Sequence, residues 1–340
     1  MPLLAFETSC DETSAAVLDN GRVLSNIVAS QIRLHAEYGG VVPELAAREH
    51  LKNLIPITRE ALTRARVEVG ALDAVAAARG PGLPSALMCG LKAAQAIAFT
   101  LGKPFFGIHH HEAHLYSPWM AGNPLRLDMP GFEPNVSLVV SGGHTMLIHV
   151  EAELKHRVLG STLDDAAGEC FDKVGKMLGL AYPAGPQIDA LAEKGRPVIP
   201  FPRPLLNEDN DDFSFSGLKT AVRYFVRDHP ESLEDAQSLH NICASAQAAI
   251  VDVLVGKTLR AARRLGVKCV TASGGVVCNR ALRSALGIAC ARHGISLRLA
   301  DVALCTDNAA MIGALAEIKM RHRLSATSLD EDISPNWALS

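Results

Sequence analysis

The feature that most constrains this chain is an internal repeat that begins with a β-hairpin. In the first half, predicted strands at residues 3–7 and 14–18 flank a polar turn at residues 8–13. In the second half, predicted strands at 137–140 and 146–150 flank Ser141-Gly142-Gly143-His144-Thr145. Two hairpins of the same plan at equivalent places predict a duplicated architecture.

The elements that follow each hairpin also agree. Strands at 74–78 and 268–272 each lead into a glycine-rich turn and a helix, at 86–100 and 279–292. Strands at 104–108 and 296–299 then precede a polar loop and a further helix. We expect two α/β lobes with helices on both sheet faces and sheets facing across a cleft, where ligands gather at strand ends. The alternative is a chance likeness between two loosely matched α/β segments.

We place the lobes at residues 1–134 and 135–340, the second with a helical insertion around 160–245. The length of 340 residues suffices for two cores, and 48% hydrophobic and 20% charged residues are typical of globular proteins. The apolar run at the N-terminus ends at Glu7, too short for export or membrane spanning, which predicts a cytoplasmic protein without a membrane partner. The eight cysteines include no CxxC pair and are expected to be buried thiols.

Four histidines lie within six positions at the end of a predicted strand: His109, His110, His111 and His114. On a helix that starts there, His110 and His114 are one turn apart on the same face, a spacing that suits two imidazole ligands of one metal ion. Packing alone explains a single histidine more easily than four. The run therefore predicts a metal site.

The equivalent loop of the second half holds Cys305-Thr306-Asp307-Asn308. If the lobes are related by pseudo-symmetry, Asp307 faces the histidines across the cleft and is the third ligand. Asp307 also precedes an apolar helix at 309–316, so the alternative role is an N-cap. The two roles are compatible.

Several polar positions are candidates for a nucleotide site. The turns at Ser141-Gly142-Gly143 and Ser273-Gly274-Gly275 expose backbone N–H groups, although glycine is also normal in any hairpin turn. Asp172 and Asp189 are able to accept hydrogen bonds from ribose hydroxyls, and the alternative is a pair of surface carboxylates. Asp11 and Glu12, at the tip of the first hairpin, are candidate proton acceptors or turn caps.

These residues belong to a set of motifs that extends along nearly the whole chain. The motifs are Glu7-Thr8-Ser9-Cys10-Asp11-Glu12-Thr13, Tyr38-Gly39-Gly40-Val41-Val42-Pro43-Glu44, Gly80-Pro81-Gly82-Leu83, the histidine run, Val140-Ser141-Gly142-Gly143-His144-Thr145, Asp164-Asp165-Ala166-Ala167-Gly168-Glu169, residues 213–219, residues 273–280 and Cys305-Thr306-Asp307-Asn308. In this set the chain resembles the TsaD family of tRNA N6-adenosine threonylcarbamoyltransferases, once called the Gcp or YgjD glycoprotease family.

The resemblance implies an actin-like fold of the sugar-kinase and heat-shock-ATPase type, with two duplicated ribonuclease-H-like lobes. It implies an acyltransferase that moves the threonylcarbamoyl group from threonylcarbamoyl-AMP to N6 of adenosine 37, in tRNAs reading ANN codons, with release of AMP. One divalent metal, iron or alternatively zinc, is then held by His110, His114 and Asp307. His109 and His111 do not match ligand positions.

The resemblance also assigns the contacts to the adenylate. The matching positions are Val139, Val140, Ser141, Gly142, Gly143, Asp172, Gly185, Asp189 and Asn279. Three places depart from the family pattern. Pro84-Ser85 follows Gly80-Pro81-Gly82-Leu83 where bacterial members carry a glycine. Ala184 replaces a common glycine in the turn before Gly185, and Val139 stands where archaeal relatives carry a tyrosine near the metal, which leaves the identity of the metal open.

The resemblance implies tRNA as a partner, together with a TsaB-type paralogue, a TsaE-type ATPase and a TsaC-type synthase upstream. A homodimer is the alternative arrangement. A basic stripe at Arg260, Arg263, Arg264 and Lys268 is a candidate tRNA surface, but we favour the alternative, a solvated helix face.

Three other functions fit the sequence less well. A zincin peptidase needs glutamate directly after its first histidine ligand, whereas His111 follows His110. A kinase or chaperone ATPase normally carries a Mg-linked aspartate in the phosphate hairpins, where this chain has Glu7 and Ser141. An inactive binding module of the same fold is expected to lack the metal ligands.

Overall fold

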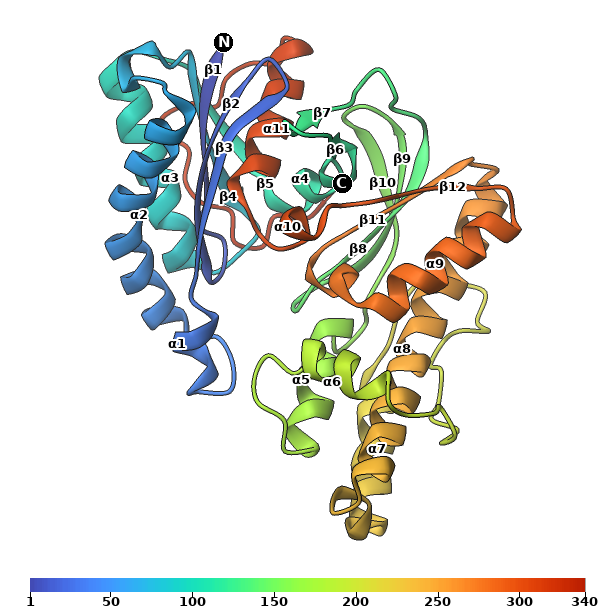
Figure 1. Cartoon of the computed structure of the whole chain (residues 1–340). Helices are drawn as coiled ribbons and strands as arrows, with labels where there is room; N and C mark the ends of the chain where they lie inside the picture. Colours follow the sequence, from blue (N-terminus) through green and yellow to red (C-terminus); the bar gives the residue numbers. More distant parts are fainter. Residues whose placement is uncertain (340) are drawn as a thin grey trace. The chain divides into compact units, whose positions relative to one another are not determined.

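The computed structural model describes residues 1–339, which form two compact units. The first unit comprises Met1–Phe132 together with the chain from Thr306 onward, and the second comprises Glu133–Cys305. Each unit is built around one β-sheet and is described separately (Figure 1).

The first unit contains a seven-stranded sheet in the order β5-β4-β1-β2-β3-β7-β6. The strands are β1 (Pro2–Glu7), β2 (Glu12–Asp19), β3 (Arg22–Ser30), β4 (Ala74–Gly80), β5 (Phe105–His109), β6 (Met120–Ala121) and β7 (Arg126–Leu127). Strands β1, β2 and β3 form an antiparallel meander, and β4 and β5 add to β1 in parallel. Leu3 to Glu7 are fully buried, as expected for a central strand covered on both faces.

Helices cover both faces of this sheet. Helices α2 (Pro43–Ala65) and α3 (Pro84–Leu101) pack on one face, and α11 (Ala309–Arg321) packs on the other (Figure 1). Proline starts both α2 and α3 at a position where the missing N–H costs nothing, and left-handed Gly102 ends α3. The short elements are α1 (Ile32–Ala36), η1 (Val69–Ala71), α4 (His110–His114) and η2 (Ser117–Trp119).

The second unit contains a five-stranded sheet in the order β10-β9-β8-β11-β12. Its strands are β8 (Asn135–Val140), β9 (Thr145–Ala152), β10 (Lys155–Ser161), β11 (Cys269–Ser273) and β12 (Ser296–Leu299). Strands β8, β9 and β10 are antiparallel, whereas β11 and β12 are parallel to β8. This order repeats β3-β2-β1-β4-β5 of the first unit, so the duplication predicted from the sequence is confirmed.

Most of the second unit's helices lie between β10 and β11. They are α5 (Ala167–Met177), α6 (Gly185–Ala192), α7 (Ser216–Asp228), η3 (Pro230–Leu233) and α8 (Ala236–Leu265), followed after β11 by η4 (Gly275–Cys278), α9 (Arg280–Arg292) and α10 (Val302–Cys305). By length and composition α8 alone among the described helices is able to cross a membrane, but 78% of its apolar window is buried inside the protein. This burial is that of a core helix.

The last part of the chain packs with the first unit, although we predicted one continuous lobe from 135 to 340. Helix α11 contacts β1, β2 and β4, and its Gly313 lies so close to Leu18 that an added Cβ would be 2.2 Å from the Leu18 side chain. Lys319 on α11 also forms an ion pair with Glu112 of α4 at 3.1 Å. The apolar face of the first sheet is thus covered by a segment distant in sequence.

The buried Glu317 on α11 makes the stability of this packing depend on pH. Burial, followed by the nearby Asp19, raises the pKa of Glu317 from 4.5 to about 7, and its Oε1 has no hydrogen-bond partner among the described residues. The folded protein keeps this proton up to about pH 7, whereas the unfolded chain releases it near 4.5. The free energy of unfolding therefore falls as pH rises through that window.

We expect Glu317→Gln to remove this loss, on the order of 2 kcal/mol at pH 7.5, because the amide does not ionise. The measurement is denaturant unfolding of wild type and variant at pH 5.0 and 7.5. Exposed Glu68→Gln is the matched control and should follow the wild type. Parallel pH profiles for wild type and Glu317→Gln would contradict the packing argument.

Candidate functional site

The predicted metal ligands lie where β5 passes directly into α4. The helix begins at His110, so His110 and His114 lie one turn apart and their ring centroids are 4.9 Å apart. His109 caps this helix, because its imidazole accepts a hydrogen bond from the backbone N–H of Glu112. Burial lowers the pKa of His109 to about 4, and its Nε2 contacts the carbonyl of Trp337 at 3.1 Å. His109 therefore serves as the N-cap of α4.

Asp307 lies beside the two histidines within the first unit. Its Oδ1 is 3.5 Å from Nε2 of His110 and 3.2 Å from Nε2 of His114. One ligand atom from each of the three residues lies within 4.8 Å of the other two. The three side chains are buried or nearly so, and two imidazoles with one carboxylate are a donor set that both iron(II) and zinc accept. These residues therefore fit a divalent metal ion.

Asp307 differs in two respects from its predicted setting. It belongs to the same unit as the histidines, because α11 returns to the first sheet, so the expected position in the opposite lobe is wrong. The cap of α11 is Asn308, whose side chain accepts a hydrogen bond from the N–H of Met311 at 3.2 Å. The alternative role of Asp307 as an N-cap is thus taken by its neighbour.

Glu7 supports the outer side of His110. The Glu7 carboxylate lies 2.9 Å from Nδ1 of His110, and the hydroxyl of Ser9 lies 3.2 Å from the same nitrogen. Burial alone would lower the pKa of His110, but the carboxylates of Asp307 and Glu7 outweigh it and raise the pKa to about 9. A carboxylate on the outer nitrogen fixes the ring and leaves Nε2 for a metal. The two carboxylates around His110 therefore favour a positive charge at this position, either a protonated imidazole or a metal ion.

The loop after β1 is held at almost every residue. The Thr8 hydroxyl donates to the carbonyl of Ala86, and the Ser9 carbonyl accepts from the N–H of Leu83, both at 2.8 Å. On the other side, His50 of α2 links the Cys10 carbonyl at 2.9 Å to the Thr13 hydroxyl at 2.8 Å. Two helices thereby fix the position of Asp11 and Glu12 relative to β1.

Asp11 and Glu12, the candidate proton acceptors, are both buried in this loop. Burial raises the pKa of Glu12 well above its usual value, and the neighbouring Asp11 and Asp307 raise it further. The hydroxyl of Ser30 contacts Glu12 Oε1 at 3.4 Å and acts in the opposite direction. A carboxyl with a raised pKa is suited to proton transfer near neutral pH.

The glycine-rich turns predicted to bind the adenylate meet in the second unit. The turn at Ser141-Gly142-Gly143 is partly exposed, and Gly168 of α5 packs against it so closely that an added Cβ would lie 2.6 Å from the Ser141 carbonyl oxygen. Gly274 has a φ of +96°, and an added Cβ would lie 2.3 Å from the Val140 carbonyl oxygen. Val139 and Val140 are buried residues of β8, paired with β9 and, at Val139, also with β11.

The remaining predicted adenylate contacts already have partners within the protein. Asp172 accepts a hydrogen bond from the N–H of Ala184 at 2.8 Å, which fixes the turn before Gly185. Asp189 is paired with Arg280 at 2.7 Å, and Asn279 caps α9 while its amide donates to Gln247 at 2.7 Å. Helix α5 contacts both α6 and η4, so these side chains belong to one region of the second unit.

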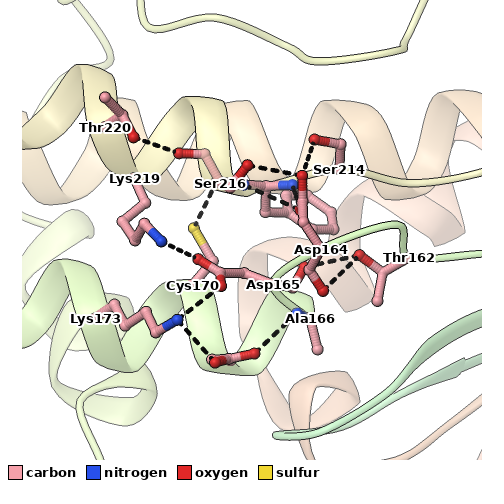
Figure 2. Close-up of polar contacts among 12 residues, drawn as sticks. Thr162, Asp164, Asp165, Ala166, Cys170, Lys173, Ser214, Ser216, Lys219 and Thr220 are labelled. Atoms are coloured by element: carbon pink, nitrogen blue, oxygen red, sulfur yellow. Dashed lines mark hydrogen bonds and ion pairs between the residues drawn. The ribbon is translucent and has the colours of Figure 1, made fainter.

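The two aspartates after β10, Asp164 and Asp165, make contacts that connect helices α5 and α7 of this region (Figure 2). The Asp164 carboxylate accepts from the backbone N–H groups of Phe215 and Ser216 at 2.8 and 3.1 Å, and from the hydroxyls of Ser214 and Ser216. This carboxylate satisfies the first turn of α7 in place of a local cap. Asp165 joins Lys173 of α5 to Lys219 of α7, each at 2.7 Å.

The sequence analysis missed the supporting roles of Glu7, His50 and Gly168. Glu7 and His110 are separated by 103 positions, and His50 and Cys10 by 40. Neither pair follows a helical or strand period. The only available signal was the position of Glu7 at the end of a strand, immediately before the polar turn.

Comparison with known proteins gives a consistent set of relatives. The family model described as TsaD, tRNA N6-adenosine threonylcarbamoyltransferase, matches residues 22–314. A tRNA N6-adenosine threonylcarbamoyltransferase of Pelobacter propionicus is 48% identical over 342 residues, covering 99% of this chain and 97% of the relative. One of Chlorobium chlorochromatii is 51% identical over 333 residues, covering 95% and 93%.

Solved structures resemble the chain in fold. HypF of T. kodakarensis has a TM-score of 0.62 at 16% identity, and the match covers 96% of this chain and 48% of that one. The activator of the 2-hydroxyisocaproyl-CoA dehydratase from Clostridium difficile, solved with bound ADPNP, has a TM-score of 0.52 at 11% identity and covers 96% and 100%. These likenesses concern the fold alone and agree with the duplicated sheets.

Substitution of the ligands gives a first test of the metal site. We expect His110→Ala and Asp307→Ala each to lose bound metal, because two donors hold a divalent ion far more weakly than three. His109→Asn, which keeps a side chain able to cap α4, should retain it. The measurement is metal content per chain by elemental mass spectrometry, with circular dichroism as the check on folding. Equal losses in all three variants would show that the ligands are misassigned.

Substitution of Glu7 tests the outer support of His110. We expect Glu7→Gln to keep the hydrogen bond but to weaken metal affinity by roughly 10- to 100-fold, because a neutral amide no longer polarises the imidazole. Competition with a chelator of known affinity measures this change. Ser9→Ala, which removes only the longer contact to the same nitrogen, should have the smaller effect. Wild-type affinity in Glu7→Gln would exclude a supporting role.

Proposed function

The chain belongs to the tRNA N6-adenosine threonylcarbamoyltransferase family, and on this basis we propose that it transfers a threonylcarbamoyl group to adenosine 37 of tRNA. The donor is threonylcarbamoyl-AMP and the acceptor is the exocyclic N6 amine in tRNAs reading ANN codons. In this reaction N6 forms a bond to the carbamoyl carbon, the bond from that carbon to the phosphate oxygen breaks, and AMP departs. The amine loses one proton in the same overall step.

The convergence of His110, His114 and Asp307 is the observation that carries this proposal. Their ligand atoms lie within 4.8 Å of one another on two segments far apart in sequence. An inactive binding protein of the same fold has no need of this donor set. The position of Glu7 against His110 adds the outer carboxylate that ligating histidines usually have.

We assign iron to this site, with zinc as the alternative. Two histidines and one carboxylate leave open coordination positions for a substrate on either metal. When bound, the ion supplies Lewis-acid polarisation of the threonylcarbamoyl carbonyl. The protein contributes the fixed orientation of the three donors, which the short α4 and the cap of α11 provide.

For the adenylate we propose the turns at Ser141-Gly142-Gly143 and Ser273-Gly274-Gly275 and the region around α6 and α9. Backbone N–H groups of the exposed Gly142 and Gly143 are suited to phosphate oxygens. Asp172 and Asp189 are the proposed ribose acceptors. Each already makes one protein contact, with Ala184 and Arg280 respectively, and a carboxylate has lone pairs for more than one donor.

Glu12 is our proposed acceptor for the proton that leaves N6, with Asp11 as the alternative. Its buried position and raised pKa make it a better base near neutral pH than an exposed carboxylate. The loop that carries it is fixed by His50 and by the contacts of Thr8 and Ser9. This fixation limits the reorganisation needed during the reaction.

The proposed partners are tRNA, a TsaB-type paralogue and a TsaE-type ATPase, with a TsaC-type synthase supplying the adenylate. A cytoplasmic location fits these partners and the burial of α8 in the second unit. We propose no membrane association.

Reaction with synthetic substrates tests the transferase proposal. We expect metal-loaded protein, threonylcarbamoyl-AMP, unmodified tRNA and the partner proteins to give the modified nucleoside and an equal amount of AMP. The measurement is nucleoside mass spectrometry together with quantitation of AMP. His110→Ala and Asp307→Ala should be inactive, because the carbonyl then lacks its electrophilic support, whereas His109→Asn should remain active. Unmodified tRNA in a mixture where a relative succeeds would exclude the proposed function.

A further inference from the structure

A pocket lined by cations lies between α5 and α7 of the second unit, and none of its lining residues is among those assigned to the adenylate. Its volume is about 380 Å³, and its lining residues are Lys173, Lys176, Met177, Lys219, Thr220 and Arg223. The two helices pack against each other, so the four cationic side chains come from both walls. Within each helix the cations are spaced by three or four residues and therefore share a face.

Two of these cations are held in place by internal carboxylates (Figure 2). Asp165 contacts Lys173 and Lys219, each at 2.7 Å, and Glu169 contacts Lys173 at 2.8 Å. The side chain of Asp165 is only 11% exposed, so it serves as an internal brace for both lysines. This brace fixes the spacing between the two walls of the pocket.

Lys176 and Arg223 carry positive charges that no ion pair among the described residues neutralises. Both are exposed, and neither has a carboxylate within ion-pair distance among residues 1–339. Lys173 and Lys219 are thus paired with Asp165 and Glu169, whereas the other two lining cations make no ion pair among these residues. The positive charges that line the pocket repel one another, and a bound anion would reduce this repulsion.

We propose that this pocket binds phosphate groups of the tRNA backbone, an inference that rests on the proposed function. A nucleic acid presents phosphates at short, regular intervals, and neutralising them releases counterions. The pocket offers little for reading bases, because the Thr220 hydroxyl already donates to the Ser216 carbonyl and Met177 is apolar. It therefore positions the tRNA without selecting its sequence.

The stripe on α8, suggested by the sequence, is the weaker candidate for the same role. Arg264 is engaged by the buried carboxylate of Asp211 at 3.2 Å, and Arg260 contacts the carbonyl of Asn210 at 3.5 Å. Arg263 and Lys268 remain as exposed positions of this stripe. They provide a matched control, because replacing both removes the same charge from the same unit.

The test compares Lys176→Gln/Arg223→Gln with the control Arg263→Gln/Lys268→Gln in the full-length chain. Affinity for fluorescently labelled unmodified tRNA is measured by anisotropy between 50 and 200 mM salt. We expect the pocket variant to bind roughly tenfold more weakly at the lowest salt, and the slope of log K against log salt to shrink by about two. The control should keep the wild-type affinity and slope.

Wild-type tRNA affinity in the pocket variant, or equal losses in both variants, would overturn the inference. Loss of a partner protein with unchanged tRNA affinity would also overturn it and would identify a protein-docking surface instead. Melting temperatures equal to the wild type confirm that the exposed substitutions leave the fold intact. The binding measurement uses no threonylcarbamoyl-AMP and does not depend on catalysis. Its result can therefore be interpreted even if the transferase proposal fails.

Discussion

The packing of α11 on the first sheet is the constraint on which the candidate metal site depends. This helix lies against β1, β2 and β4, and the residue just before its cap is Asp307. The ion pair between Lys319 and Glu112 links the same helix to α4, which carries both histidines. The carboxylate and the imidazoles therefore meet because two helices are fixed on one sheet, although His114 and Asp307 are 193 positions apart in the chain.

Duplication explains where the functional loops lie. In both units the first strand of the hairpin is central and the parallel strands add beside it, so the hairpin turn and the glycine-rich turn come from neighbouring strands. In the first unit these loops support the metal ligands, through contacts such as that between Ser9 and Leu83. In the second unit the corresponding loops meet where Gly274 passes Val140. The same architecture thus brings polar loops together in both units.

Much of this structure could be predicted from local patterns in the sequence. The hairpins, the glycine-rich turns and the spacing of His110 and His114 depend on residues close together in the chain, and all three are present as predicted. The setting of Asp307 was not predictable in the same way, because it depends on the long-range packing of α11 against β1, β2 and β4. Glu7 and His50 act through single long-range contacts, for which no periodicity exists.

The division of the first unit into two segments has a consequence for how the protein is made. During synthesis all residues of the second unit leave the ribosome before α11 does. Until α11 emerges, one apolar face of the first sheet remains uncovered. Most of the α11 residues that cover this face are fully buried in the finished protein. The nascent chain therefore exposes an apolar surface until α11 emerges, and Asp307 joins His110 and His114 only late in folding.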